Sequence, residues 1–171
     1  MRIDRGIVLA AGASKRLGSH KALIEVEGQT LVQLVCSKLQ SAGLSVTVVT
    51  RNSLKQKIEN LLPNVSTVVN PNPELGRTGT IQRGIESIGT GPLLVIPVDR
   101  PGFSLETINL LCKTNTTTIP TYEQKGGHPI AITPQDCENI MQAEPDIPLR
   151  ELISPERMHV EDPHLHLNID T

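Results

Sequence analysis

The apolar positions of this chain fall into two patterns that alternate along the sequence. Continuous apolar runs are typical of strands buried on both faces of a sheet, whereas apolar residues at three- and four-residue spacing are typical of helices. We expect strands at residues 7–9, 46–50, 65–69 and 92–99. We expect the intervening helices at residues 31–42, 54–62 and 79–88. This order of strands and helices predicts a mostly parallel sheet.

The second half of the chain continues with shorter elements. Ser104 can cap a helix from Leu105 to Cys112, and Pro134 can open a helix that ends near Ala143. We expect further strands at residues 116–120, 129–133 and 165–169, and an extended segment at 22–26. The whole pattern predicts an α/β fold over residues 1–171. We expect one domain with three layers and a doubly wound, mostly parallel, Rossmann-like sheet.

Composition and charge exclude several classes of partner. The net charge is −2, and the chain has one Phe, one Tyr and no Trp. Neither a basic surface nor aromatic stacking platforms for bases are expected, so we expect no nucleic-acid partner. The sequence has no signal-peptide pattern and no apolar run near the roughly 20 residues that span a bilayer. With three widely spaced cysteines, this pattern favours a cytoplasmic protein with no membrane partner.

A glycine-rich, basic loop follows the first expected strand and runs to Lys21. It combines Gly12 and Gly18 with the cations Arg16 and Lys21. Small residues let the backbone approach a ligand closely, and cations balance phosphate charges. Five residues separate the two glycines, and Ala22 follows Lys21. The loop is therefore neither a P-loop nor a dinucleotide-binding loop.

The spacing Leu-Ala-Ala-Gly-x-Ser-x-Arg-x-Gly-x-x-Lys resembles the signature loop of nucleotidyltransferases with a GT-A-like fold. It is most similar to MobA-like enzymes, and among them to molybdenum cofactor cytidylyltransferases. The resemblance implies that the small residues hold the base and ribose of an NTP and that Arg16 and Lys21 hold its phosphates. The implied nucleotide-binding residues of this loop are Leu9, Ala10, Ala11, Gly12, Ser14, Arg16, Gly18 and Lys21.

A second candidate site is the carboxylate of Asp99, which ends the expected central strand. Ligands of open α/β sheets bind at the carboxyl ends of the strands, and Mg²⁺ takes one or two protein carboxylates together with phosphate oxygens. The segment Pro97–Pro101 resembles the second signature of the family, in which the Asp binds metal, although Arg100 replaces an apolar residue or Gln. The end of the chain resembles the closing strand of the family and implies Asp170 as a second Mg²⁺ ligand.

Two further segments match the family less closely. Asn70 and Thr80 resemble the stretch between the third strand and a helix N-terminus, which implies contact with the nucleotide, while Arg77 between them is expected as a surface cation. Gly127 and His128, followed by Pro129, resemble the acceptor side of enzymes that handle the molybdenum cofactor. A segment at 146–150 resembles a family motif in which glycines stand where this chain has prolines at 145 and 148.

The resemblance implies Mg²⁺-dependent transfer of NMP from an NTP to a phosphate-bearing acceptor, with Arg16, Lys21 and Asp99 as catalytic residues. Ala11 favours CTP, because guanylyl enzymes more often have Gly there, and the favoured acceptor is molybdopterin. A sugar-1-phosphate or other small phospho-acceptor is an alternative. Another alternative, motivated by Arg100 and the short C-terminus, is a non-catalytic module that delivers a nucleotide or cofactor to a molybdenum enzyme.

Overall fold

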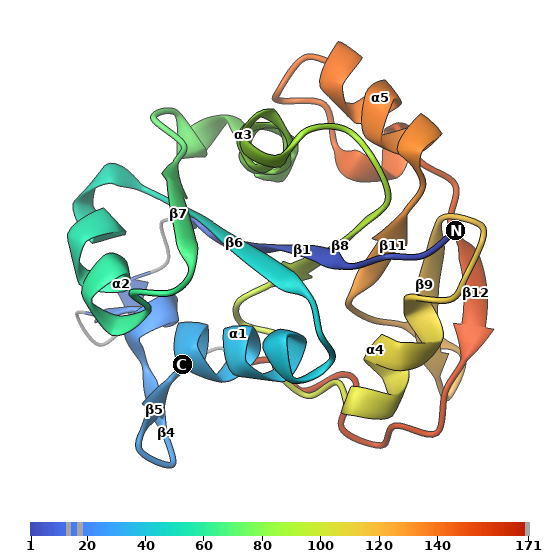
Figure 1. The fold of residues 1–171 in the computed structure, drawn as a ribbon, viewed down its shortest axis with the longest axis horizontal. Coiled ribbons are helices and arrows are strands. Elements are labelled where there is room, and N and C mark those ends of the chain that lie inside the picture. The colour runs from blue at the N-terminus through green and yellow to red at the C-terminus, as the bar shows by residue number, and fades with distance from the viewer. Residues whose placement is uncertain (13–14, 17–18, 170–171) are drawn as a thin grey trace.

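A mixed β-sheet forms the middle layer of the protein (Figure 1). The computed structural model describes residues 1–12, 15–16 and 19–169, with residues 15, 16 and 19 described by their backbone alone. Within these residues the sheet has eight strands in the order β10-β9-β11-β8-β1-β6-β7, with β12 paired to β9. The strands are β1 (Arg5–Ala10), β6 (Ser45–Thr50), β7 (Ser66–Val69), β8 (Leu93–Pro97), β9 (Thr118–Tyr122), β10 (Lys125–Gly126), β11 (Ile130–Ile132) and β12 (Glu156–His159).

The strands β8, β1, β6 and β7 run parallel, as the alternating pattern predicted. In their register Leu9 lies opposite both Val49 and Pro97. The next strand, β11, turns antiparallel to β8, and β9 is antiparallel to β11. The predicted α/β fold with a mostly parallel sheet is therefore confirmed, with an antiparallel extension at one side.

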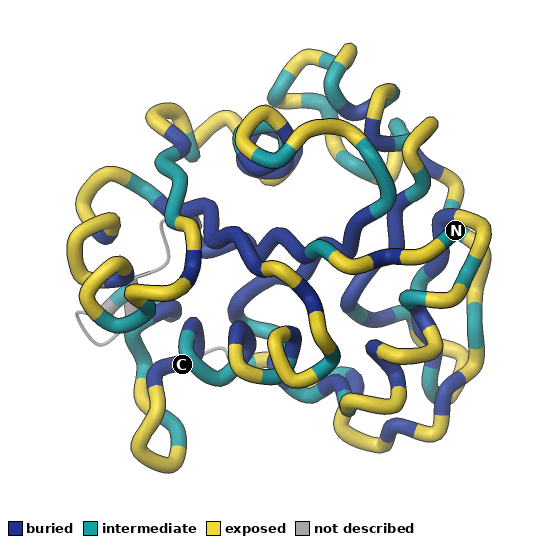
Figure 2. The backbone as a smooth tube through the Cα atoms, viewed as in Figure 1, coloured by how far each residue is buried: buried dark blue, intermediate teal, exposed yellow. Residues whose placement is uncertain are grey.

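Helices cover both faces of the sheet and complete the predicted layers (Figure 1). One face carries α1 (Leu31–Ser41), α2 (Lys55–Leu61) and α4 (Leu105–Leu111). The other face carries α3 (Arg77–Ile88) and α5 (Pro134–Gln142). Side chains alternate along β1, so that Val8 packs toward the first group and Ile7 toward the second. Figure 2 shows the central strands as a continuous buried band between the helices.

The helix starts follow from capping residues that the sequence contains. The Thr30 hydroxyl accepts a hydrogen bond from the Gln33 N–H at 3.3 Å, and Gln33 reaches back to the Thr30 backbone in a capping box. The Ser104 hydroxyl caps α4 by accepting a hydrogen bond from the Thr107 N–H, and Pro134 occupies the first turn of α5, as expected. These side chains satisfy backbone N–H groups that have no partner within the helix.

Several short elements lie in and after the loop that follows β1. Two small hairpins pair β2 (Lys15–Arg16) with β3 (Ser19–His20) and β4 (Glu25–Val26) with β5 (Gln29–Thr30). The expected extended segment at 22–26 is partly wrong, because a 3-10 helix, η1 (Lys21–Leu23), occupies its start. This turn buries Ala22 while Lys21 stays near the edge of the sheet.

The three cysteines are free, and burial raises the pKa of Cys36 to about 12. A thiol with such a pKa stays protonated at neutral pH and acts as an apolar packing group. Among the described residues, no helix combines the length and apolar character needed to cross a membrane.

Helix α3 packs against β1 and β6 through Gly84, where a side chain would have no room. A Cβ atom at Gly84 would lie 2.8 Å from Cδ1 and 2.9 Å from Cγ2 of Ile7, and 3.1 Å from Cγ2 of Val49. These carbons are fully buried, so they cannot move far without disturbing the core. The absence of a side chain at Gly84 therefore sets the distance between α3 and the sheet.

We expect Gly84→Ala to lower the free energy of unfolding by about 1–3 kcal/mol, because overpacking outweighs the gain in helix propensity. Urea denaturation followed by circular dichroism measures this change. Ser87→Ala is the matched control on an exposed position of the same helix, and we expect it to change stability by less than about 0.5 kcal/mol. Equal stability of the two variants would contradict the close packing of α3.

Candidate functional site

A cavity of about 250 Å³ opens at the carboxyl ends of β1 and β8. Its position follows from the parallel register, which brings the loops after both strands to one edge of the sheet. Many of the residues named from the sequence line it. These are Leu9, Ala10, Ala11, Gly12, Lys21, Thr80 and Asp99. Backbone and small side chains thus form one wall of the cavity, and charged groups form another.

Lys21 and Asp99 meet inside this cavity. Lys21 Nζ donates a hydrogen bond to Asp99 Oδ2 at 3.2 Å, and the two side chains are 17% and 24% exposed. The pair is shielded enough to have a defined geometry and open enough to exchange partners with a ligand. Asp99 lies in the turn after β8 rather than in the strand itself. The sequence prediction that these two residues share a site is consistent with this contact.

Asn70 lies behind the cavity wall and hydrogen-bonds to Thr80, which is part of that wall. Its side-chain amide donates to Thr80 Oγ1 at 3.0 Å, and its Oδ1 accepts from the Asn72 N–H at 3.0 Å. Asn70 is buried, and it lies outside the described wall of the cavity, to which Thr80 belongs. The structure therefore places Thr80 where it can contact a ligand and Asn70 where it orients the Thr80 hydroxyl.

The end of the described chain runs along the Asp99 turn. The Ile169 N–H donates to the Asp99 carbonyl at 2.9 Å. The predicted strand at 165–169 is wrong, because residues 163–166 form a turn and pair with no strand. Leu165 instead packs as a single buried side chain, and a Cβ at Gly127 would lie 2.8 Å from its Cγ. The last strand of the described chain is β12, which the sequence analysis missed.

Asp162 anchors this C-terminal segment to the loop that follows Asp99. Its Oδ2 accepts from the Ser104 N–H at 2.7 Å and from Thr107 Oγ1 at 2.9 Å, and the residue is 4% exposed. Lys38 donates to the carbonyls of Pro101 and Phe103 in the same loop. Burial lowers the pKa of Lys38, and Asp162 opposes this effect. The loop between Asp99 and α4 is thus held from both sides.

His128 lies near the charged side chains of Asp99, Arg77 and Arg100. Burial, together with the positive charges of Arg77 and Arg100, lowers its pKa to about 4, and Asp99 opposes this effect. The imidazole is therefore neutral at physiological pH. Its Nδ1 is buried and has no hydrogen-bond partner within the described part of the chain. The predicted acceptor-side residue His128 is thus near Asp99 with an unused polar atom.

A second cavity of about 550 Å³ shares Gly76 and Arg77 with the first. The segment 145–150 lines this cavity. Pro145 and Pro148, which stand where the family motif has glycines, therefore form part of its wall. Arg77, which the sequence analysis interpreted as a surface cation, is the functional candidate that it missed. No sequence signal marks Arg77, because the two cavities that it lines form only when the start of α3 and the segment 145–150 pack together.

Several predicted site residues lie outside what the structure describes. Ser14, Gly18 and Asp170 are not among the described residues, and the side chain of Arg16 is not described. Among the described residues, no group of three His, Cys, Asp or Glu side chains is placed to hold a metal ion. Asp99 is therefore the described carboxylate of this cavity, with Asp170 still a prediction.

Comparison with known proteins identifies relatives by sequence. The model of the MobA-like NTP transferase domain matches residues 6–161. A probable molybdenum cofactor guanylyltransferase of Bacillus mycoides is 30% identical over 111 residues, which are 62% of this chain and 54% of that protein. A molybdenum cofactor guanylyltransferase of Xanthomonas euvesicatoria is 32% identical over 97 residues, covering 56% of this chain and 47% of that protein. The chain spans about half the length of the curated relatives it matches.

Solved structures share the fold over nearly the whole chain. A nucleotidyl transferase from Methanothermobacter has a TM-score of 0.77 at 21% identity and covers 98% of this chain and 91% of its own. A Mycobacterium tuberculosis protein solved in complex with manganese has a TM-score of 0.79 at 17% identity, covering 100% and 94%. At these identities the likeness establishes the fold alone.

We expect Asp162→Asn to lower the free energy of unfolding by about 1–3 kcal/mol, because the amide replaces a charged acceptor that holds two buried donors. Glu161→Gln is the matched control, since the Glu161 side chain is 84% exposed. Thermal and urea denaturation of both variants check the prediction. If the Asp162 variant were as stable as the control, the C-terminal segment would not depend on this anchor.

Proposed function

The chain belongs to the family of MobA-like NTP transferase domains, and on that premise we propose that it transfers an NMP group from an NTP to a phosphate-bearing acceptor. In this reaction an oxygen of the acceptor phosphate forms a bond to the α-phosphorus. The bond from the α-phosphorus to the oxygen bridging it to the β-phosphate breaks, and pyrophosphate leaves. The observation that carries the proposal is the Lys21–Asp99 pair in the cavity at the ends of β1 and β8.

The chemistry of the cavity suits the transfer of a nucleotide. Ala10, Ala11 and Gly12 allow the backbone to approach a base and ribose closely. We propose that Lys21 and Arg16 offset the negative charge of the triphosphate and of the departing pyrophosphate. No protein nucleophile is required, because the acceptor supplies the attacking oxygen. Catalysis then depends on positioning and on charge neutralisation.

A divalent cation fits the donors present. Mg²⁺ commonly takes one or two protein carboxylates and completes its shell with phosphate oxygens and water. Asp99 offers one carboxylate at the cavity, and we propose Asp170 as the second, since it follows the residue bonded to the Asp99 carbonyl. When bound, the ion neutralises phosphate charge and orients the reacting groups. One solved relative in fold contains manganese, which supports a divalent ion.

The names of the curated relatives bear on the choice of nucleotide and acceptor. Both reported relatives are guanylyltransferases of the molybdenum cofactor, which favours GTP over the CTP expected from Ala11. We therefore propose GMP as the transferred group and molybdopterin as the acceptor, with His128 and Gly127 on the acceptor side. Ala11 on the cavity wall keeps CMP transfer as the second candidate. A sugar-1-phosphate acceptor and a non-catalytic delivery role are the remaining alternatives.

We expect Asp99→Asn to reduce turnover by at least 100-fold, because it removes the described carboxylate that would hold the cation. The measurement is pyrophosphate release from GTP, Mg²⁺ and molybdopterin. Glu106→Gln, an exposed carboxylate in the first turn of α4, is the control and should keep full turnover. No turnover by the unaltered protein, with nucleotide binding intact, would favour the non-catalytic role instead.

Nucleotide preference gives a separate prediction. We expect GTP to bind at least tenfold more tightly than CTP in the presence of Mg²⁺, as measured by calorimetry on the same protein preparation. If CTP bound more tightly than GTP, the transferred group would be CMP, as Ala11 predicts. Equal affinities would contradict both assignments and indicate that the wall at Ala10 and Ala11 does not discriminate bases.

A further inference from the structure

Arg77 occupies the boundary between the two cavities. It is the first residue of α3 and follows Gly76, whose φ of 125° turns the chain sharply into the helix. Arg77 borders both the nucleotide cavity, with Lys21 and Asp99, and the second cavity, with the segment 145–150. It is the one charged side chain that lines both hollows among the described residues.

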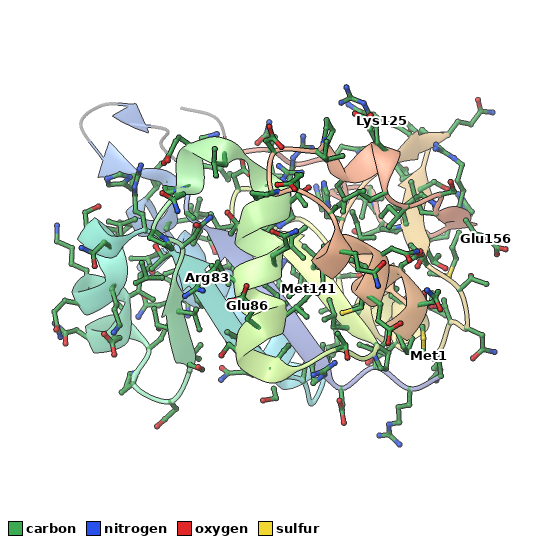
Figure 3. The ribbon with its side chains drawn as sticks, turned by 90° about the horizontal axis from the view of Figure 1, so that it is seen from above. Met1, Arg83, Glu86, Lys125, Met141 and Glu156 are labelled. Atoms are coloured by element: carbon green, nitrogen blue, oxygen red, sulfur yellow. The ribbon has the colours of Figure 1, made fainter. Side chains whose placement is uncertain are left out.

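The guanidinium of Arg77 is not used to hold the fold together. It makes no hydrogen bond or ion pair with any residue in the described part of the chain, and Arg77 lines both cavities. Some other arginines have structural partners. Arg83, on the same helix, donates to the Val69 carbonyl at 3.2 Å and to Glu86 at 2.7 Å (Figure 3). Arg5 donates to the Ile88 carbonyl at 2.8 Å.

The electrostatic surroundings of Arg77 favour an anion. Burial lowers the pKa of Arg77, the negative charge of Asp99 opposes that effect, and the positive charge of Arg100 adds to it. Arg77 and Arg100 are thus two positive charges near one carboxylate, with a neutral His128 beside them. Since an arginine stays protonated in any such setting, an unused guanidinium is available for bidentate binding of a phosphate.

The wall next to Arg77 is fixed in place. Thr78 Oγ1 donates to the Ile147 carbonyl at 2.5 Å, and the Gly79 N–H donates to the Pro145 carbonyl at 3.2 Å. These bonds join the start of α3 to the segment 145–150. The second cavity therefore has a formed wall before any ligand binds, which lowers the entropy lost on binding.

The second cavity combines an apolar surface with few charges. Its lining includes Ile130, Pro145, Ile147, Pro148, Leu149 and Ile153. Rigid prolines and branched side chains suit a flat or largely apolar molecule better than a hydroxyl-rich one, which would need many polar partners. Asp146 and Arg150 are the other charged residues on its described wall.

We propose that Arg77 binds the phosphate of the acceptor where the two cavities meet, while the second cavity holds the flat body of a phosphomonoester acceptor. This inference rests on the proposed function. The acceptor phosphate must approach the α-phosphate of the nucleotide, and both are anions. A guanidinium at the junction offsets their repulsion and fixes the attacking oxygen near the nucleotide.

The test uses phenyl phosphate as a phosphomonoester with a flat apolar body. The full chain is first saturated with Mg²⁺ and a non-hydrolysable GTP analogue, and phenyl phosphate is then added in a calorimeter. We expect measurable binding to the unaltered protein and binding at least tenfold weaker to Arg77→Gln. Affinity for the GTP analogue alone should fall by less than tenfold in the variant, because Lys21 remains to bind the triphosphate.

Matched variants keep the result interpretable. Arg83→Gln removes a cation from the same helix outside both cavities and should bind phenyl phosphate as the unaltered protein does. Arg77→Lys keeps the charge without the planar fork and should show an intermediate loss. Because Arg77 has no described structural partner, its variants should keep the melting temperature of the unaltered protein, which a thermal denaturation scan checks.

Three results would overturn the proposal. They are absence of phenyl phosphate binding to the unaltered protein, equal binding by Arg77→Gln, and a tenfold loss of GTP-analogue affinity in Arg77→Gln, which would assign Arg77 to the nucleotide. Failure of the proposed function has a different signature. It would appear as no pyrophosphate release from any NTP with Mg²⁺ and molybdopterin, while the phenyl phosphate measurement still decides the role of Arg77.

Discussion

The parallel pairing of β1 with both β6 and β8 is the constraint on which the site depends. Parallel strands end at one edge of a sheet, so the loops that follow them meet there. In this register Leu9 lies opposite Pro97, and Lys21 and Asp99, separated by 78 positions in the sequence, come within 3.2 Å of one another. The distance between α3 and the sheet, set at Gly84, then brings Thr80 and Arg77 to the same edge.

The charges gathered at this edge suit anions more than cations. Lys21 forms an ion pair with Asp99, and Arg77 interacts electrostatically with both Asp99 and Arg100. Burial, and then Arg77 and Arg100, lower the pKa of His128 and keep it neutral. A cavity with excess positive charge and partly apolar walls concentrates phosphorylated ligands. The carboxylate of Asp99 can still bind a divalent cation in these surroundings, because the cation would bind together with the phosphates whose charge it neutralises.

Most of the fold could be predicted from the sequence because the patterns that indicate its strands and helices are local. Buried runs specified β1, β6 and β8, and the capping residues Thr30 and Ser104 fixed helix starts. The predictions failed where contacts between distant segments determine the local structure. Residues 165–169 have the alternation of a strand, but Leu165 is buried against Gly127 while the chain turns. The strand β12 has the mixed sequence Glu-Arg-Met-His at the sheet edge, where solvent exposure removes the hydrophobic signal.

The same distinction separates the parts of the site. Glycine and cation spacing predicts a phosphate loop because such a loop is one continuous segment, and Asp99 stands out because it follows a buried run. Arg77 carries no such mark, since its interest comes from two cavities that exist only after β1, α3 and the segment 145–150 have packed together.

The C-terminal segment shows how closely stability and the proposed chemistry are joined in this fold. Asp162 fixes it to the start of α4, and the Ile169 N–H fixes it to the Asp99 carbonyl. Between these contacts, Gly102 leaves no room for a side chain, because a Cβ there would lie 1.9 Å from the His164 carbonyl oxygen. The turn that presents Asp99 to the cavity is therefore shaped by residues that never face a ligand. If Asp170 is the second carboxylate, the contacts that close the fold also bring the metal ligands together.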